Sequence, residues 1–328
     1  MRNEVRVGIA GLGEFGELHL RVFSQIPSVK VTRICSRSET RARELAARYG
    51  VPGISTDYAE FAAAEDVDVV SVTTLGKDHR QVVVPALERG KHVLVEKPIA
   101  DTTEDAEAMA EAAAGAKGIL AVGHICRFMP EYFQAWRAIA SGRLGDIAMI
   151  QAWRNNHHST LAPGRKLNPM RETAIHDIDL ALWFTGSPVV SAHGYKRRAQ
   201  QLAEADSCLA VARLACGTIC SFASSWLGRD AAPAGLDARM KIIGTRGEIE
   251  IALPSRSYTA IDDSTHRFTE LAGAADPLLL IQSPLRAEIE CFLQRVMGNS
   301  EAPIVTAQEA LAALRTAILL DESCEAVP

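Results

Sequence analysis

The chain has 328 residues, of which 48% are hydrophobic and 23% are charged, and its net charge is −5. These values are typical of a globular protein, and the length fits two domains that each bury a core. The small net charge excludes a general attraction to nucleic acid or to anionic membranes. Because the sequence shows no apolar signal stretch and no run long enough to span a bilayer, we expect a cytoplasmic protein.

The seven cysteines are odd in number and scattered through predicted strands and helices. Buried free thiols are therefore expected rather than disulfides. Cys216 and Cys220 flank a short turn, but no second pair of cysteine or histidine residues stands nearby at the spacing of a metal site. The sequence predicts no metal centre.

The first third of the chain alternates strand and helix patterns, which predicts an α/β Rossmann domain with a doubly wound parallel sheet. The expected strands are 5–10, 30–35, 68–73, 92–95 and 119–123, and the expected helices are 14–26, 38–49, 78–89 and 102–114. We place this dinucleotide-binding domain at residues 1–123.

After Gly123 the pattern changes to strands at hairpin spacing, which predict an α+β domain with a largely antiparallel open sheet over residues 124–328. The expected strands are 146–154, 188–197, 207–215, 218–227, 238–244 and 247–253, and the expected helices are 130–141, 172–184, 284–297 and 306–320. This second domain is expected to bind the substrate and to carry the contacts between subunits.

The strand 218–227 has two different faces. Its bulky residues Cys220, Phe222 and Trp226 alternate along one face and are expected to pack on the helices of the domain. The other face carries the smaller residues Ile219, Ser221, Ala223 and Ser225. Because that face is flat, we expect it to lie against a second copy in a homodimer or homotetramer.

The first predicted strand runs into the turn Gly11-Leu12-Gly13-Glu14-Phe15-Gly16, after which a helix begins. Gly11 permits the tight turn, Gly13 lets the backbone approach a pyrophosphate, and Gly16 lets the helix lie close to the strand. The phosphates would face the amides at the start of the helix. We expect this turn, including Glu14 and Phe15, to bind a dinucleotide.

Ser36 stands twenty residues beyond Gly16, where an acidic residue normally holds the adenosine ribose of NAD. A serine there does not repel a 2′-phosphate, and Arg37, with Arg33 or Arg41, could bind one. The sequence therefore favours NADP over NAD. The alternative is that these arginines are solvated and that the site accepts either cofactor.

Ligands of such sheets bind beyond the carboxyl ends of the strands, so the residues that follow each strand are candidates for chemistry. The expected cofactor contacts at these ends are Thr73, Thr74, Glu96 and Lys97, with His79 either a contact or a residue of the helix face. Pro98 biases Lys97 toward an extended backbone. The ammonium of Lys97 can stabilise a developing alkoxide.

Four parts of the sequence, in this order, resemble the glucose-fructose oxidoreductase, inositol dehydrogenase and rhizopine catabolism (Gfo/Idh/MocA) family. They are the turn 11–16, the run from Gly90 to Pro98 with its Glu-Lys-Pro element, Gly123-His124 with Arg127-Phe128, and His176-Asp177-Ile178-Asp179. The resemblance implies a Rossmann domain and a substrate domain whose sheet often mediates dimers or tetramers. It also implies NAD(P)-linked oxidation or reduction of a carbinol on a sugar, cyclitol or related polyol.

The resemblance implies that Lys97 and His176 are catalytic. Glu172 stands where the family commonly has aspartate, and on one continuous helix Glu172 and His176 would share a face. In the mechanism that follows, a hydride passes between the carbinol carbon and nicotinamide. His176 takes the hydroxyl proton, Lys97 stabilises the alkoxide and Glu172 positions His176. No metal is required.

The segment between Arg154 and Arg171 carries cations and no acidic residue. The expected substrate contacts are Arg127, Arg154, Asn155, His157 and Arg171, together with Lys97 and His176. A guanidinium here could clamp a carboxylate, as in a sugar acid. Alternatively, Arg165 and Lys166 are solvated surface charges and the substrate is a neutral polyol.

Two other functions use the same fold. An enzyme with tightly bound NAD(P) could oxidise its substrate only transiently and end in isomerisation or elimination, without releasing reduced cofactor. A non-catalytic regulator could sense the dinucleotide alone. The regulator does not need Lys97 and His176 together, and the chain lacks a basic patch for nucleic acid. The sequence therefore favours the oxidoreductase.

Overall fold

The computed structural model describes residues 4–156, 168–200, 204–227, 236–253, 257–262, 266–270 and 277–327. The chain forms two compact units: Met1–Ile125 with Gln282–Leu311, and Cys126–Ile281 with Ala312–Pro328. The sequence division at residue 123 placed both C-terminal helices in the second domain, whereas the structure groups 282–311 with the first unit. There the Val122 N–H donates a hydrogen bond of 2.9 Å to the Val305 carbonyl.

The first unit is built on a six-stranded parallel sheet in the order β3-β2-β1-β4-β5-β6. Its strands are β1 (Val5–Ala10), β2 (Val29–Cys35), β3 (Gly53–Ser55), β4 (Val69–Val72), β5 (His92–Glu96) and β6 (Leu120–Gly123). Its helices are α1 (Glu14–Ser24), α2 (Glu39–Tyr49), α3 (Tyr58–Ala63), η1 (Gly76–Asp78), α4 (His79–Glu88), α5 (Thr103–Gly115) and most of α9 (Pro277–Val296). This strand order confirms the predicted Rossmann sheet, and its direction of winding reverses between β1 and β4.

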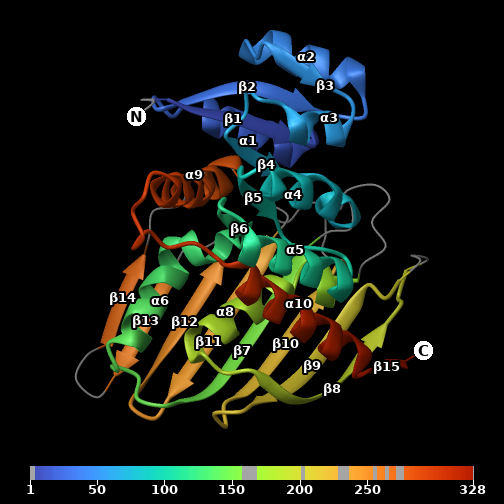
Figure 1. Cartoon of the computed structure of the whole chain (residues 1–328). Helices are drawn as coiled ribbons and strands as arrows, with labels where there is room; N and C mark the ends of the chain where they lie inside the picture. The colour runs from blue at the N-terminus through green and yellow to red at the C-terminus, as the bar shows by residue number, and fades with distance from the viewer. Residues whose placement is uncertain are drawn as a thin grey trace. The chain divides into compact units, whose positions relative to one another are not determined.

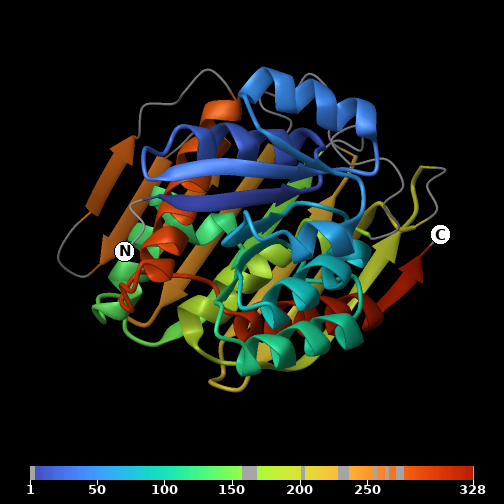
Figure 2. The ribbon, with the colours of Figure 1, turned by 45° about the horizontal axis from the view of Figure 1, so that its top comes forward.

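Helices cover both faces of this sheet (Figure 1, Figure 2). On one face Ile9 of β1, Phe23 of α1 and Phe292 of α9 are fully buried in a single apolar cluster. On the other face Gly8 leaves room for Phe61 of α3, because an added Cβ would lie 2.8 Å from that ring. Packing of Phe292 in the cluster of the first unit explains why this stretch does not belong to the second domain.

The second unit is built on a nine-stranded sheet in the order β14-β13-β12-β11-β7-β10-β9-β8-β15. Its strands are β7 (Ile147–Asn156), β8 (Val189–Arg197), β9 (Ser207–Leu214), β10 (Ile219–Ser225), β11 (Leu236–Gly244), β12 (Gly247–Leu253), β13 (Ser257–Asp262), β14 (His266–Glu270) and β15 (Cys324–Val327). Its helices are η2 (Ile125–Phe128), α6 (Pro130–Ala140), α7 (Pro169–Glu172), α8 (Ile175–Thr185) and most of α10 (Ala307–Glu322). Among the described strands of this nine-stranded sheet, only the pairs β7–β10 and β8–β15 are parallel, which confirms the predicted, largely antiparallel sheet.

The helices α6, α8 and α10 lie over one face of the nine-stranded sheet (Figure 1). Along β10 and just beyond it, Cys220, Phe222 and Trp226 are buried, whereas Ile219 is 46% exposed. The predicted division of this strand into a packed face and an open face is therefore confirmed.

The helix predicted over 172–184 is interrupted. Asn168 caps the short helix α7 by accepting the Arg171 N–H at 3.2 Å, and α7 ends at Glu172. Thr173 and Ala174 form a turn before α8 begins at Ile175. The prediction that Glu172 and His176 lie one turn apart on a continuous helix was wrong, because the chain turns between them.

All seven cysteines are free, and five of them are buried. Burial raises the pKa of the Cys35 thiol to about 12, so this group stays protonated at neutral pH. Within the described part of the chain, no helix has the length and hydrophobicity needed to cross a membrane.

Candidate active site

The glycine turn after β1 has the backbone that its sequence predicts. Gly11 has a φ of +93°, a conformation that side chains other than glycine rarely adopt. A Cβ at Gly16 would strike the Gly11 carbonyl, so the start of α1 lies directly on the turn. At Gly13 an added Cβ would meet nothing within 4 Å. The space in front of Gly13 is therefore open.

The helix α1 begins at this open space. Gly13 precedes Glu14 and has no side chain with which to cap the first amides of the helix. Its carbonyl accepts the Glu17 N–H at 2.9 Å, so the helix starts in regular geometry. Uncapped amides and the positive end of the helix dipole favour an anion. Together these features fit the pyrophosphate of a dinucleotide.

Thr73 anchors the turn to the neighbouring strand β4. Its hydroxyl lies 2.7 Å from the Gly11 carbonyl and 3.1 Å from the Ala10 carbonyl, and its N–H donates to Ala10 at 2.8 Å. The predicted cofactor contact Thr73 thus uses its hydroxyl to hold the turn, and Thr74 lies beside it, half-buried.

His79, at the start of α4, is 1% exposed. Its Nδ1 lies 3.0 Å from the Ile99 carbonyl and its Nε2 lies 3.1 Å from the Thr74 carbonyl. Burial lowers the pKa of this imidazole. The ring therefore connects the loop after β4 to the loop after β5 from inside the protein, and we assign it to positioning these loops rather than to contacting the cofactor.

Ser36 and Arg37 follow β2, as the sequence predicts. The Ser36 hydroxyl accepts the Ser38 N–H at 3.1 Å. The Arg37 side chain is 64% exposed, and its guanidinium lies 3.5 Å from the Asp78 carboxylate. An exposed arginine can rotate toward a phosphate, so Arg37 remains a predicted contact of the 2′-phosphate.

The two other arginines considered for the phosphate are paired at shorter distances, and their side chains are less exposed, 23% for Arg33 and 31% for Arg41. Arg33 donates to Asp66 at 3.0 Å, and Arg41 forms ion pairs with Glu17 and Glu44. The predicted contacts of a 2′-phosphate therefore narrow to Ser36 and Arg37.

Lys97 follows β5 on the edge of the sheet that also carries the glycine turn. Because the strands are parallel and Ala10, Val72 and Val95 are aligned, the residues after β1, β4 and β5 emerge at one level. We call this edge the carboxyl edge. Lys97 is half-buried there. The glycine turn and Lys97 therefore lie at the same edge of one sheet.

Glu96, the last residue of β5, is turned inward and is 9% exposed. Its Oε1 lies 3.2 Å from His19 Nε2, and its Oε2 accepts the Lys97 N–H at 3.3 Å. We therefore assign the predicted cofactor contact Glu96 to a buried hydrogen-bond network beneath the carboxyl edge.

In the second unit, Arg154 of β7 forms a buried ion pair with Asp177 of α8. Its Nε and Nη2 donate to the two carboxylate oxygens at 3.1 and 2.7 Å, and Nη2 also donates to the Tyr132 hydroxyl at 3.0 Å. Burial alone would lower the pKa of Arg154, but the Asp177 carboxylate outweighs it and raises that pKa well above its usual value. We assign Arg154 to holding α8 rather than to the predicted substrate contact.

Arg127 forms a second buried ion pair with α8. Its Nε and Nη2 donate to Asp179 at 2.8 and 2.7 Å, and its guanidinium lies 5.3 Å from the centroid of the Trp183 ring. Such a bidentate, stacked geometry fixes both partners. Arg127, also predicted as a substrate contact, is therefore assigned to anchoring the same helix.

Asn155 points to the opposite face of β7 from Arg154, because successive residues of a strand alternate. It shares that face with Trp153, which is 40% exposed, and its Nδ2 lies 3.4 Å from Asp237 Oδ2. Since Arg154 contacts α8, Asn155 faces away from α8 and from His176. Asn155 therefore does not lie on the side of β7 where the predicted substrate contact would require it.

His176 lies in the first turn of α8 and is half-buried, and Glu172 at the end of α7 is 4% exposed. Between them, Thr173 Oγ1 accepts the Trp226 Nε1–H at 2.9 Å, which ties the turn to the end of β10. Arg171 is half-buried on α7. The predicted contact His157, and the cations Arg165 and Lys166, lie outside the described residues.

The sequence analysis missed the aspartates 177 and 179 as partners of the two arginines. A signal for them existed, because two carboxylates in an otherwise apolar helix require cationic partners when they are buried. It also missed His19 and Ser71 beside Glu96. No local pattern marks those residues, since the three come from separate elements of the first unit.

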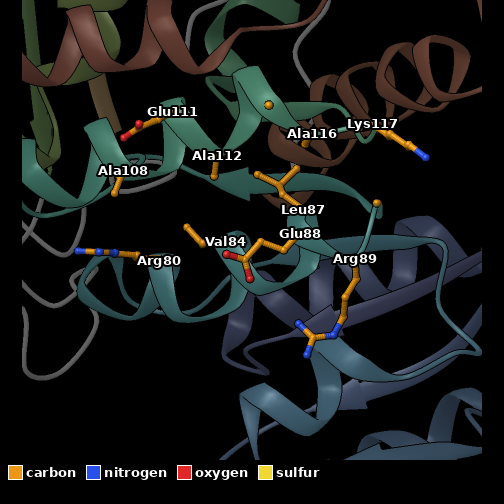
Figure 3. A pocket seen from close by; sticks show the side chains of 12 residues that line it. Arg80, Val84, Leu87, Glu88, Arg89, Ala108, Glu111, Ala112, Ala116 and Lys117 are labelled. Atoms are coloured by element: carbon orange, nitrogen blue, oxygen red, sulfur yellow. The ribbon is translucent and has the colours of Figure 1, made fainter.

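A hollow of about 740 Å³ lies between α4 and α5 (Figure 3). Its lining combines alanine and glycine with charged residues of both signs, including Arg80, Arg89 and Glu88. These residues come from the two helices and their ends and not from the carboxyl edge. The hollow is therefore separate from the glycine turn and from Lys97.

The family comparison agrees with this geometry. Residues 5–124 match the family described as "Oxidoreductase family, NAD-binding Rossmann fold", and residues 132–250 match the "GFO/IDH/MocA C-terminal domain". The chain belongs to the Gfo/Idh/MocA oxidoreductase family. The resemblance stated from its motifs is confirmed.

Curated members of the Gfo/Idh/MocA family are similar over different lengths. A 4-carboxy-2-hydroxymuconate-6-semialdehyde dehydrogenase from Sphingobium sp. is 37% identical over 140 residues, 43% of this chain and 44% of that relative. The scyllo-inositol 2-dehydrogenase (NAD(+)) of Bacillus subtilis is 26% identical over 269 residues, 80% of this chain and 78% of that relative. This chain thus matches less than half the length of the first relative.

A solved structure of the family has the same fold. The scyllo-inositol dehydrogenase of Lactobacillus casei, with NAD(H) and scyllo-inositol bound, superposes with a TM-score of 0.82 at 23% identity. The superposition covers 98% of this chain and 97% of that one.

Proposed function

We propose that the protein is an NAD(P)-dependent oxidoreductase that transfers a hydride between a secondary carbinol of a cyclitol or related polyol and nicotinamide. The observation that carries this proposal is the carboxyl edge, where the open turn at Gly13 follows β1 and Lys97 follows β5, with only β4 between these two strands of one sheet. Membership of an oxidoreductase family and the inositol dehydrogenases among the relatives support the substrate class.

The proposed mechanism gives each residue one task. When bound, the dinucleotide supplies a hydride acceptor or donor; the turn 11–16 would hold its pyrophosphate, and Ser36 with Arg37 its adenosine ribose. Lys97 donates a charged hydrogen bond to the carbinol oxygen and stabilises the alkoxide. His176 accepts the hydroxyl proton as general base. For Glu172, which ends α7, we keep the predicted role of positioning His176, now acting across the turn at Thr173 and Ala174 and not along one helix.

Steady-state assays with NAD and NADP on a panel of cyclitols, sugars and alditols test this proposal. We expect substrate-dependent release of free reduced cofactor with at least one cyclitol or polyol. Conversion of the substrate without any release of reduced cofactor would instead identify the isomerase-like enzyme. Dinucleotide binding without turnover of any member of the panel would favour the regulator.

The charge of the substrate is tested by matched pairs, such as an aldonic acid and its alditol. Because Asp177 already neutralises Arg154, we expect the neutral member to have an equal or higher kcat/KM that does not change with salt. A preference for the acid that weakens at high salt would contradict this expectation. It would favour a sugar acid, in line with the carboxylated substrate in the name of the Sphingobium relative.

For the cofactor, we propose that NADP is accepted and slightly preferred, because Ser36 places no carboxylate beside a 2′-phosphate. Replacing Ser36 with aspartate is expected to shift the ratio of the two dissociation constants toward NAD by about 1 to 3 kcal/mol, roughly 5- to 150-fold. Titration of the protein with each cofactor measures this ratio. Thr40→Asp, which adds the same charge at an exposed position of α2, is the control and should leave the ratio unchanged. A natural protein that binds NAD but ignores NADP would contradict the proposal.

For assembly, we propose that two copies meet through the open face of the nine-stranded sheet. Trp153, Ala223, Leu209 and Tyr195 are neighbours across four adjacent strands of that face. Leu209 is 51% exposed and Tyr195 is 49% exposed, so the row is an apolar surface of the kind that interfaces cover.

Sedimentation velocity at micromolar concentration tests this interface. The natural protein is expected to sediment as a dimer or tetramer, and Leu209→Lys should dissociate it, because it would place an unpaired charge in the apolar contact of each copy. Glu111→Lys, on the exposed surface of α5, is the control and should leave the assembly intact. A natural protein that sediments as a monomer would refute the proposed interface.

A further inference from the structure

Three polar side chains form a buried cluster beneath the glycine turn: His19 of α1, Ser71 of β4 and Glu96 of β5. His19 Nδ1 lies 2.9 Å from Ser71 Oγ, and His19 Nε2 lies 3.2 Å from Glu96 Oε1. His19 and Ser71 are fully buried. The proposed mechanism does not use this cluster, although it joins the helix that begins at the dinucleotide turn to the strand that ends before Lys97.

The hydrogen bonds determine how the ring of His19 is used. An ionised Glu96 carboxylate only accepts hydrogen bonds, so His19 Nε2 must carry a proton and donate it to Oε1. His19 Nδ1 then either accepts the Ser71 hydroxyl proton or, in the charged ring, donates to Oγ. In both states the Nε2–H of His19 is directed at Glu96.

The carboxylate of Glu96 is held on more than one side. Its Oε2 accepts the Lys97 N–H at 3.3 Å. A Cβ at Gly123 would lie 2.5 Å from Oε1, so the backbone of β6 leaves it little room. The rings of Phe15 and His19 are 5.2 Å apart, which places an apolar group against the cluster. The carboxylate therefore links the imidazole of His19 to the peptide of Lys97.

We propose that His19 is a positioning residue for the reaction: it fixes the Glu96 carboxylate, which in turn fixes the Lys97 peptide and the direction in which the Lys97 side chain leaves the carboxyl edge. This inference rests on the proposed role of Lys97 as the group that stabilises the alkoxide. A displacement of about 1 Å at a reacting group can lower a rate by about a hundredfold, so a residue that sets this position acts on turnover without touching the substrate.

Two amide variants separate the two hydrogen bonds of His19. The amide of His19→Asn is short and can reach only the position of Nδ1, beside Ser71. The longer amide of His19→Gln can reach the position of Nε2 and donate to Glu96. We expect His19→Asn to lower kcat about 10- to 100-fold. In the same variant the KM and the cofactor dissociation constant should stay within about threefold of their natural values, since the lost interaction acts in the transition state. His19→Gln should recover most of kcat.

His92→Ala is the matched control. His92 is a half-buried histidine at the opposite end of β5, and its Nδ1 accepts the Ile119 N–H at 3.2 Å. Its removal disturbs the same strand away from Lys97, so kcat should not change. An equal loss of kcat in His19→Asn and His19→Gln, or the same loss in His92→Ala, would show that the cluster only supports the fold and would overturn the inference.

Amide hydrogen exchange of the peptide that contains Lys97 tests the link without any turnover. We expect faster exchange there in His19→Asn, and natural exchange in His19→Gln and His92→Ala. Unchanged exchange at Lys97 in His19→Asn overturns the positioning role, whatever the enzyme acts on. An absence of dehydrogenase activity in the natural protein would instead contradict the proposed function, while the exchange result would still decide the role of His19.

Discussion

Replacing Lys97 with alanine is expected to lower kcat by about two to four powers of ten. In the proposed mechanism, the lost group is the cation that donates to the carbinol oxygen as its negative charge develops. Lys97 is half-buried at the end of a strand and is not among the apolar core residues, so the fold should persist. Steady-state kinetics, with a cofactor titration and a thermal unfolding curve for each variant, measure the three effects separately.

Two further variants show whether the position of the charge matters. Lys97→Arg keeps the charge but replaces a compact ammonium with a planar fork, so it should recover only part of the rate. Lys30→Ala removes an exposed lysine on β2 and should leave kcat unchanged. If Lys97→Ala keeps kcat within about tenfold of the natural value, its assigned role in stabilising the alkoxide is wrong.

The cofactor half of the site could be predicted because its requirements are local. The φ of +93° at Gly11 and the close approach of α1 at Gly16 are properties of six consecutive residues, and glycine is the residue that permits both. The carboxyl edge could be predicted for a similar reason. In a parallel sheet every strand ends at the same edge, so the order of strands in the chain brings the glycine turn and Lys97 to one edge.

Short elements could not be predicted from hydrophobic periodicity. β3 has three residues and α3 has six, which is too few to show a period of two or of 3.6. β15, with four residues, was missed for the same reason. The break between α7 and α8 was missed because the apolar pattern continues across it, although Asn168-Pro169 marks a new helix start.

The substrate half of the site was the least predictable, since a sequence shows charges but not their partners. Arg154 and Asp177 are 23 residues apart in the chain, and only the fold brings β7 beneath α8 to pair them. The sequence of a cationic segment looks the same whether its arginines are free or are paired with carboxylates from elsewhere in the chain. The sequence analysis therefore assigned two arginines to the substrate, Arg154 from the charge of its segment and Arg127 from a motif of the family resemblance, although both hold α8 in place.

Replacing Arg154 with methionine is expected to destabilise the second unit by about 3 to 5 kcal/mol, because it leaves the Asp177 carboxylate buried without its bidentate partner. Asp177 is 1% exposed, so water cannot replace the lost interaction. All four tryptophans of the chain lie in the second unit, and their fluorescence during urea unfolding therefore reports on that unit alone.

The unpaired charge of Asp177, rather than the missing arginine side chain alone, should account for the loss of stability in Arg154→Met. Arg154→Met combined with Asp177→Asn removes the unpaired charge and should recover a large part of the stability. Lys241→Met breaks a cross-strand pair with Glu248 whose side chains are 35% and 36% exposed, and it should cost less than about 1 kcal/mol. Because His176 is next to Asp177 on α8, Arg154→Met should also lose activity at urea concentrations below the midpoint of its unfolding. A loss below about 1 kcal/mol in Arg154→Met would mean that α8 is held in place mainly by its apolar contacts, such as those of the fully buried Ile178, and not by the ion pair.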